Sequence, residues 1–447
     1  MPAVRSRSFS WTVAALLASA LAWTSVSHVV RKRSRTPDIL VVVVDSLRAD
    51  HLPGGGYSRS TAPFLDRWAA DAGVFREAYT HGTQTRIAMA SLFTGSLPTL
   101  HRVRDVKVVR GNGRSDAVSP RLVTWAESLR DAGYETWGYS ANVNVSEKFG
   151  FAHGFTRWSQ HQSDDPAILA TDFLKQLRDR AARNPDAPLF AYLHFNGVHS
   201  PYFAPPPYDK AFPAPPGRRV WASYHHGVTA NDLAFTVAQY DGAILYQDKV
   251  LSETLPAWES AVGVRPRVTL FLADHGEEFQ DHGGLGHGST VYRELAHVPL
   301  IVKAPGVKAG VHDEPVAYAD VHRLVLDLAG AAVTDVARGR PYAQWTSAEP
   351  TLYTESSDGV AGLRWGTWLL ERPRDHPRRA AFYDRRTDPR ELNPLHEKAQ
   401  LRELQARMDQ IVSRDGRVAD DLGTPARVEL DSEMAERLHA LGYVGNP

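Results

Sequence analysis

Four runs of consecutive apolar residues are spaced along the chain, and each is typical of a strand buried on both faces. Segments with helical periodicity lie between them, so strands and helices alternate. The sequence therefore predicts an α/β fold with a large, mostly parallel mixed sheet flanked by helices. The strand runs are Ile39 to Val44, Pro188 to Phe195, Val268 to Ala273 and Val298 to Lys303. The predicted helices cover 122–131, 165–183, 231–262 and 321–328, and another starts at Thr61-Ala62-Pro63 with Thr61 as its cap.

The character of the chain changes after Gly330. From Thr351 onward the apolar runs are shorter and charged residues are more frequent, which is typical of a smaller unit. We therefore expect a main catalytic domain over 36–345 and a small C-terminal α+β subdomain over 346–447, preceded by a leader over 1–35.

The leader indicates export. Arg5 and Arg7 precede an apolar segment at 11–22 with small residues near its end, as in a secretory signal peptide. Apolar character continues weakly to Val30, which allows one membrane span of about 20 residues. A cleaved signal peptide and a membrane anchor therefore both stay open, and we expect a periplasmic, extracellular or membrane-anchored protein.

Composition excludes several kinds of chemistry. The 447 residues include 51 basic and 51 acidic side chains, so there is no bulk electrostatic case for binding nucleic acid. The Cys count is 0, which excludes disulfides, thiolate metal sites and a cysteine nucleophile. The 19 His residues are more than structural roles require, and several fall in clusters.

Two of the predicted strands end in an acid. Asp45 follows the first strand, and Asp274 with His275 follows the third. In open α/β sheets, sites form at the carboxyl ends of the strands. Carboxylate and imidazole ligands without Cys suit a divalent cation, with Ca, Mn, Mg and Zn all open. Such a cation would lower the pKa of a coordinated hydroxyl.

Candidate hydroxyls lie at Thr83 and Thr85, just before a short apolar run that predicts a helix. A helix N-terminus stabilises an anion, so either hydroxyl could be a nucleophile, although Thr before a helix is commonly a cap. His199 and His287 could bind an anionic ester and protonate a leaving group. Each of these two histidines also fits a hydrogen-bonded structural residue.

The sequence resembles the sulfatase family of the alkaline-phosphatase superfamily over nearly everything from Pro37 onward. Residues 91–95 are similar to the end of its nucleophile signature, C/S-x-P-x-R-x-x-L-x-T-G, and counting back from Gly95 puts Thr85 at the nucleophile position. Together the similar segments are specific, although each alone is weak. The others are Pro37 to Asp50, Thr61 to Phe75, Tyr192 to Tyr202, Asp274-His275-Gly276-Glu277, His287-Gly288 with Val298-Pro299-Leu300, and Tyr383 to Asn393.

The chain departs from the family at the nucleophile. Sulfatases oxidise a Cys or Ser there to formylglycine, whereas this chain has Thr85, with Ile87 and Met89 in place of the signature's Pro and Arg. Ser46 replaces the second acid of the family's opening Asp-Asp pair. The ligand set that the resemblance implies is then Asp45, Asp274, His275 and Thr85 itself, enough for one cation with open positions.

A second resemblance concerns the same stretch. Gly82-Thr83-Gln84-Thr85 is similar to the G-T-x-T of phosphoethanolamine transferases in the same superfamily, whose second Thr takes the phosphoryl group. In those enzymes too a His follows the Asp-His pair, as His287 does here. They usually carry several membrane spans and disulfides, whereas this chain has at most one span and no Cys.

Together the resemblances imply a metal-dependent hydrolase or transferase acting on an anionic sulfate or phosphate ester. Thr85 favours phosphodiester chemistry, because a threonyl sulfate lacks the geminal hydroxyl with which formylglycine expels sulfate. Two alternatives stay open: an arylsulfatase-type sulfuric ester hydrolase, and a catalytically weak family member that binds an anionic ligand. The substrate, the acceptor, the metal and the oligomeric state are left open by the sequence.

Overall fold

The computed structural model describes residues 36–104, 114–183, 186–220, 227–261, 265–395 and 397–440. The expected leader at 1–35 lies outside these residues. Within them, no helix combines the length and the apolar character needed to cross a membrane.

An eight-stranded sheet forms the centre of the molecule, and β1 lies inside it with every residue buried. Its Val-rich sequence fits this place, because both faces of the strand are covered. The expected α/β fold with a large mixed sheet is thus confirmed. In spatial order the strands are β12 (Gly310–His312), β2 (Gly73–Phe75), β11 (Leu300–Lys303), β8 (Arg267–Ala273), β1 (Asp38–Val44), β7 (Leu189–Phe195), β5 (Glu135–Ser140) and β6 (Arg157–Gln160).

The parallel part of this sheet positions the site. β1 pairs in parallel with β8 on one side and with β7 on the other, so Val44 lies opposite both Ala273 and Phe195. The residues that follow these strands therefore emerge at one edge. Beyond β8 the sheet turns antiparallel at β11, and this is why it is mixed rather than fully parallel.

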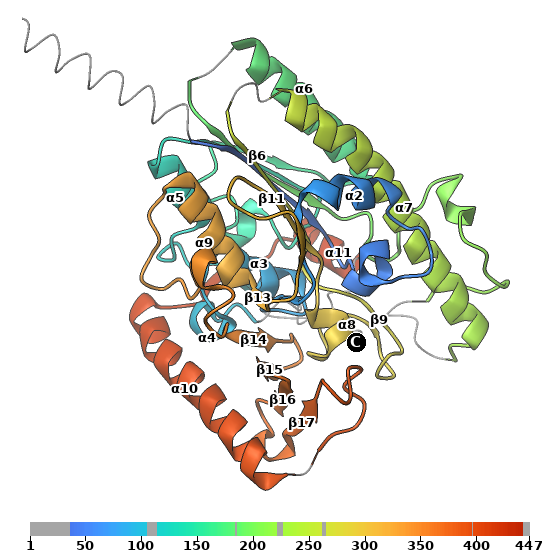
Figure 1. Cartoon of the computed structure of the whole chain (residues 1–447), viewed down its shortest axis with the longest axis vertical. Coiled ribbons are helices and arrows are strands. Elements are labelled where there is room, and N and C mark those ends of the chain that lie inside the picture. The colour runs from blue at the N-terminus through green and yellow to red at the C-terminus, as the bar shows by residue number, and fades with distance from the viewer. Residues whose placement is uncertain are drawn as a thin grey trace, which may run out of the picture.

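Helices cover both faces of the sheet (Figure 1). The long pair α6 and α7 packs together with α2 on one face, whereas α3, α5 and α9 pack on the other. Their bounds are α2 (Pro63–Trp68), α3 (Thr85–Thr94), α5 (Trp125–Asp131), α6 (Pro166–Arg183), α7 (Ala230–Ala261) and α9 (Tyr318–Ala329). Shorter elements are α4 (Pro98–His101), α8 (Arg293–Ala296) and the strand pairs β9 (Glu278–Phe279) with β10 (Leu285–Gly286) and β3 (Ala78–Tyr79) with β13 (Val316–Ala317).

A second, smaller sheet follows in the C-terminal part, as expected. Its four antiparallel strands pack against α10, with Leu363, Phe382 and Met408 in the shared core. The chain then returns to the main body, because β18 pairs with β4. The elements are β14 (Leu352–Glu355), β15 (Val360–Trp365), β16 (Trp368–Pro373), β17 (Ala381–Asp384), α10 (Lys398–Leu422), β4 (Arg114–Ala117), β18 (Ala426–Glu429) and α11 (Ser432–Ala440).

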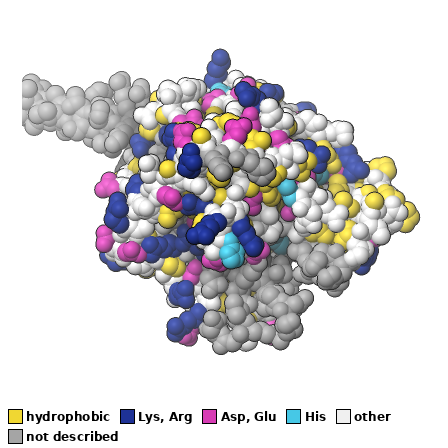
Figure 2. Space-filling view, turned by 90° about the horizontal axis from the view of Figure 1, so that it is seen from below, with side chains coloured by type: hydrophobic (Ala, Val, Ile, Leu, Met, Phe, Trp, Pro, Cys, Tyr) yellow, Lys and Arg dark blue, Asp and Glu magenta, His cyan; other side chains and the backbone are white. Residues whose placement is uncertain are grey.

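The surface below this sheet carries charges of both signs. Figure 2 shows basic and acidic side chains interspersed there, with histidine beside basic side chains, rather than one continuous field of either sign.

Two predicted helix starts differ from the structure. Thr61 caps nothing: its hydroxyl donates to the carbonyl of His51 at 2.6 Å, and Ala62 stands at the N-cap of α2. The helix expected from residue 122 begins at Trp125, because Thr124 and Glu127 form a capping box there. In both cases a local hydrogen bond, rather than apolar periodicity, decides where the helix starts.

Candidate active site

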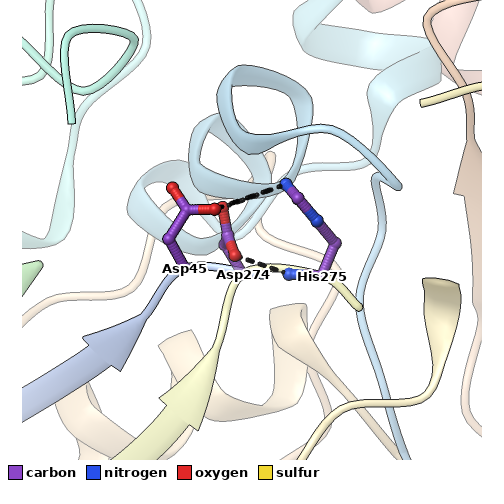
Figure 3. Close-up of side chains that lie close together, drawn as sticks. All are labelled: Asp45, Asp274 and His275. Atoms are coloured by element: carbon purple, nitrogen blue, oxygen red, sulfur yellow. Dashed lines mark hydrogen bonds and ion pairs between the residues drawn. The ribbon is translucent and has the colours of Figure 1, made fainter. Parts of the chain in front are cut away.

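Asp274 and Asp45 lie side by side where β8 and β1 end, and His275 lies next to them (Figure 3). Asp274 Oδ1 accepts hydrogen bonds from the backbone N–H of His275 at 2.8 Å and of Ser46 at 3.0 Å. Its Oδ2 accepts no hydrogen bond from any described residue and lies 3.2 Å from His275 Nε2. All three side chains are fully buried.

Ser46 shapes this cluster through its backbone. It adopts a left-handed conformation with φ of +58°, which is uncommon for a residue with a side chain, and its N–H reaches Asp274. Its hydroxyl donates to Asp45 Oδ1 at 2.8 Å. The residue that replaces the family's second acid therefore links the two remaining carboxylates.

Asp45 is held on its other side by polar side chains. Asn142 donates to Asp45 Oδ2, and His194 Nε2 lies 3.5 Å from the same oxygen. His194 is itself oriented by the hydroxyl of Tyr192, 2.7 Å from Nδ1. Both oxygens of the buried Asp45 carboxylate are thus held by neighbouring side chains.

Thr85 is the first residue of α3, and its hydroxyl faces the cluster. Oγ1 lies 3.2 Å from His275 Nε2, and the residue is fully buried. The cap of α3 is Gln84, whose side chain accepts from the N–H of Arg86 at 3.0 Å. The interpretation of Thr85 as a helix cap is therefore wrong. Thr83 has a structural contact instead, donating to the carbonyl of Thr290 at 2.7 Å.

The two histidines singled out from the sequence lie beside this cluster. The rings of His199 and His287 are 5.0 Å apart, and the His287 ring lies 4.3 Å from that of His275. Nδ1 of His199 is 2.7 Å from the carbonyl of Ser200, and Nδ1 of His287 is 3.1 Å from Glu277 Oε1. The structure thus brings together all six site residues that the sequence proposed: Asp45, Thr85, His199, Asp274, His275 and His287.

Burial and neighbouring charges set the protonation of the site. Burial alone would raise the pKa of Asp45, but the imidazoles of His199, His194 and His275 outweigh it and hold the pKa far below its usual range. Burial lowers the pKa of His275, which favours the neutral imidazole. Burial also opposes the charged form of His199, yet the charges of Asp45 and Glu277 raise its pKa overall.

These properties fit a divalent cation. Ligand atoms of Asp45, Asp274 and His275 lie within 4.8 Å of one another. A buried carboxylate oxygen without a hydrogen bond, such as Asp274 Oδ2, is costly unless a cation compensates it. A neutral imidazole and ionised carboxylates are the forms in which these side chains bind metal.

Three contributors to the site were not given a role from the sequence. Asn142 follows β5 at the same edge of the sheet, so its position after a predicted strand was the available signal. His194 lies within β7, and Glu277 stands two positions after His275, both inside segments already noted for their resemblance. Asn142 and His194 reach Asp45, which is distant in sequence, so no local pattern encodes these two contacts.

The fold and the site together define an ester hydrolase of the alkaline-phosphatase superfamily. Strand-end acids converge there with a buried hydroxyl at the start of a helix. Residues 37–331 match the family model described as Sulfatase, and the chain belongs to that family.

Relatives and solved structures agree with this assignment. A choline-sulfatase of Rhizobium meliloti (strain 1021) is 24% identical over 436 residues, covering 81% of this chain and 82% of the relative. The structure of a phosphonate monoester hydrolase from Silicibacter pomeroyi superposes with a TM-score of 0.66 at 19% identity, covering 85% of this chain and 96% of that one. A 2-O GAG sulfatase structure superposes with a TM-score of 0.69 at 17% identity, covering 90% of this chain and 96% of that one.

Proposed function

We propose that this protein is a metal-dependent hydrolase or transferase of anionic esters that uses Thr85 as its nucleophile and favours phosphodiesters. The observation that carries the proposal is the position of the Thr85 hydroxyl, buried at the start of α3 and 3.2 Å from His275 Nε2 in the carboxylate cluster. A hydroxyl at the N-terminus of a helix lies at the positive end of the helix dipole, which stabilises a negative charge on its oxygen.

In this proposal Asp45, Asp274, His275 and Thr85 would hold one divalent cation. When bound, that cation would lower the pKa of the Thr85 hydroxyl and offset negative charge that develops on the ester. Asn142 and Ser46 keep the Asp45 carboxylate in place through hydrogen bonds. The buried setting excludes water from these contacts and strengthens them.

The reaction would proceed in two displacements. Thr85 enters and leaves the cycle as the alkoxide, which a bound cation would favour. Its Oγ attacks the phosphorus, the bond from phosphorus to the leaving oxygen breaks, and that oxygen takes a proton from the protonated imidazole of His199 or His287. Water or an acceptor alcohol then attacks the phosphorus of the threonyl ester, gives up its proton to the same imidazole, and releases Thr85. Atoms and protons balance over the two steps, and no redox partner is needed.

A phosphate ester is favoured over a sulfate ester as substrate because Thr85 cannot eliminate sulfate from a covalent intermediate. A threonyl phosphate can be resolved by attack on phosphorus, whereas a threonyl sulfate lacks the geminal hydroxyl that eliminates sulfate. A phosphodiester carries one negative charge, as a sulfate ester does, so an anion pocket of this family would suit it. The likeness to a phosphonate monoester hydrolase also supports this choice.

A second candidate is sulfate ester hydrolysis of the arylsulfatase type. The choline-sulfatase relative supports it, since its similarity spans most of both chains. A third is a family member of weak activity that binds an anionic ligand, which the presence of Ser46 and Met89 motivates.

One experiment separates these candidates: purified protein is assayed against phosphate monoesters, phosphodiesters and aryl sulfates with several divalent metals, with and without an alcohol acceptor. We expect phosphodiesters to be cleaved fastest. Efficient cleavage of aryl sulfates without any phosphodiesterase activity would overturn the argument from Thr85 in favour of sulfate ester hydrolysis. No turnover with any metal would leave the ligand-binding candidate.

Export is also a proposal, since it rests on residues 1–35 alone. Cell fractionation tests it: we expect the protein outside the cytosol, either beginning near residues 20–23 or retained in membranes after a high-salt wash. Intact chain found only in the cytosol would contradict export.

A further inference from the structure

Arg374 is a partly exposed arginine of the C-terminal subdomain that the proposed reaction does not use. It directly follows β16, and its backbone N–H donates to the carbonyl of Gly359 at 2.8 Å, in the turn between β14 and β15. The exposed fraction of its side chain is 33%. A ligand in solvent can therefore reach this guanidinium.

The turn between β14 and β15 touches residues on both sides of the candidate active site. Ser357 Oγ donates to the carbonyl of Gly288 at 2.8 Å. A Cβ at Gly288 would come within 2.8 Å of Ser357 Oγ and 3.4 Å of Gln84 Cγ, so these three residues meet. Gly288 directly follows His287, and Gln84 directly precedes Thr85. The turn therefore borders the segments that carry the proposed nucleophile and one candidate proton donor.

The guanidinium of Arg374 lies on this turn with one edge open. A Cβ at Gly359 would be 3.4 Å from Arg374 Nη2 and 3.5 Å from its Nε. Nη1 donates to Glu355 Oε2 at 3.0 Å, whereas Nε and Nη2 donate to no residue that the structure describes. These two groups form one edge of the planar fork, which can bind both oxygens of a carboxylate, sulfate or phosphate at once.

Charges around Glu355 leave one arginine in excess. Its buried carboxylate also accepts from Nε of Arg104 and, at 2.9 Å, from Nη2 of the same residue. Burial alone would raise the pKa of Glu355, but the charges of Arg104 and Arg374 outweigh it and lower the pKa, so the group is ionised. Two guanidinium groups thus share one carboxylate. The exposed Asp358 of the same turn opposes an anion, so attraction would depend on direct contact with Arg374.

We infer that Arg374 is a specificity-determining residue that binds a second anionic group of the substrate through the open edge of its guanidinium. The inference rests on the proposed function, and it narrows the substrate class to phosphodiesters in which one alcohol carries a carboxylate or another group with two acceptor oxygens. Arg374 takes no part in bond breaking. It favours the charged substrate over an uncharged one of similar size.

The test uses the full-length protein and a set of chromogenic phosphodiesters. Butyl 4-nitrophenyl phosphate carries no second charge. In 3-carboxypropyl 4-nitrophenyl phosphate the retained alcohol carries a carboxylate, and in butyl 3-carboxy-4-nitrophenyl phosphate the leaving group does. We expect kcat/KM of the wild type to be at least about 10-fold higher for one of the carboxylated esters than for the uncharged one. Because Arg374 is partly exposed, added salt should reduce this preference.

Variants of Arg374 separate its charge from its shape. Arg374→Gln should abolish the preference, whereas Arg374→Lys should keep part of it, because lysine retains the charge but not the fork. Glu355 keeps both of its bonds from Arg104 in either variant. Arg130→Gln is the matched control: this exposed arginine of α5 lies 3.2 Å from Asp131. Its preference should equal that of the wild type.

The preference compares esters on one preparation, so a partial loss of folded protein does not change it. Equal kcat/KM for charged and uncharged esters in the wild type, or a preference that survives in Arg374→Gln, would overturn the inference. If Arg374→Gln does not fold, an undiminished preference in Arg374→Lys would overturn it instead.

The proposed function can fail separately from this role of Arg374. If the wild type cleaves none of the esters with any divalent metal, the proposed function is overturned, and calorimetric binding of the same esters then tests Arg374. A carboxylated ester should bind the wild type about 10-fold more tightly than the uncharged ester does, and Arg374→Gln should lose this difference. Equal affinities for all the esters would overturn the inference.

Discussion

At the scale of single residues, the site depends on side chains that have no solvent around them. Thr85, Asp45, Asp274 and His275 are all fully buried, so each polar atom must be matched by another group or by a cation. The Thr85 hydroxyl does not cap α3, because the cap of this helix is the side chain of Gln84. The burial of Thr85 follows from that of α3, whose residues are all buried, but its hydroxyl faces His275 rather than capping the helix.

Replacing Thr85 tests its proposed role as nucleophile. Thr85→Ala should lower kcat by at least about 1000-fold, because the variant lacks the hydroxyl that forms the covalent ester in the proposed reaction. Metal should remain bound, since three protein ligands are left. Thr85→Ser, which keeps the hydroxyl, should retain part of the activity. Steady-state kinetics with metal analysis by mass spectrometry measures both, and unchanged turnover in Thr85→Ala would rule out the assignment.

Removing a carboxylate tests the metal site. Asp274→Asn should lose bound metal and activity together, because an amide does not supply the charge that a cation requires in a buried site. Added metal should raise the melting temperature of the wild type but not of Asp45→Asn/Asp274→Asn. Asp313→Asn, an exposed position paired with Arg76, serves as a control that keeps its metal. Full metal occupancy in the double variant would show that the ligands lie elsewhere.

At the scale of elements, the segment from β9 to α8 is fixed by one histidine. The ring of His282 stacks on Tyr292 with centroids 3.7 Å apart. Its Nδ1 lies 2.8 Å from Glu294 Oε1 and its Nε2 lies 3.0 Å from the carbonyl of Glu391. Both ring nitrogens thus face acceptors, an arrangement that only the doubly protonated, cationic ring satisfies fully.

This contact predicts a pH dependence of stability. Burial opposes the charge on His282, but the hydrogen bond and charge of Glu294 outweigh it and raise its pKa to about 9. A raised histidine pKa means that the folded state binds the proton more tightly, so the contribution is complete below about pH 6.5 and is lost as pH rises through about 9. We expect the free energy of unfolding of the wild type, relative to His282→Gln, to fall by about 2 kcal/mol across that range.

Urea denaturation at a series of pH values measures this difference. His376→Gln is the matched control, since His376 is exposed in a surface turn, and its profile should run parallel to the wild type. A constant difference between wild type and His282→Gln at all pH values would contradict the prediction.

At the scale of the whole molecule, the C-terminal sheet supports the site from outside. Arg364 and Glu391 form an ion pair at 3.3 Å in which both side chains are fully buried. Arg364 donates to the carbonyl of Val291, and Glu391 accepts from the N–H of Arg293 at 2.8 Å. The N–H of Thr83 donates to the carbonyl of Glu355 in β14. The small sheet thus holds the segment that follows His287 and the one that precedes Thr85.

Breaking the buried pair should destabilise the protein strongly. Glu391→Ala leaves the Arg364 charge buried without its partner, which costs about 3–5 kcal/mol of unfolding free energy. Glu403→Gln, which removes an exposed helical pair with Arg407, should cost less than about 0.5 kcal/mol. Denaturant unfolding compares the two. If both variants lost a similar free energy of unfolding, the buried pair would contribute no more to stability than the exposed one.

The buried strands of the sheet and the acids of the site could be predicted from the sequence, because local patterns mark both. Apolar runs mark buried strands locally, and acids at their ends mark the edge where sites form, so Asp45 and Asp274 could be paired from the order of residues alone. The antiparallel pairing of β11 depends on contacts that no short window contains, whereas the cap at Gln84 is a local contact with Arg86 that the apolar pattern does not show. The role of Asn142 was missed because its contact with Asp45 joins residues 97 positions apart.

The placement of β1 between β7 and β8 also has a kinetic consequence. Ser46 and Asp274 meet across 228 positions of sequence, so the cluster cannot assemble until the centre of the sheet has paired. Metal would therefore find no high-affinity site in the collapsed chain and would bind only after the slow, long-range step. Added metal should leave the rate of refolding unchanged and should lower the rate of unfolding. A bound ion would then stabilise the completed fold without helping it to form.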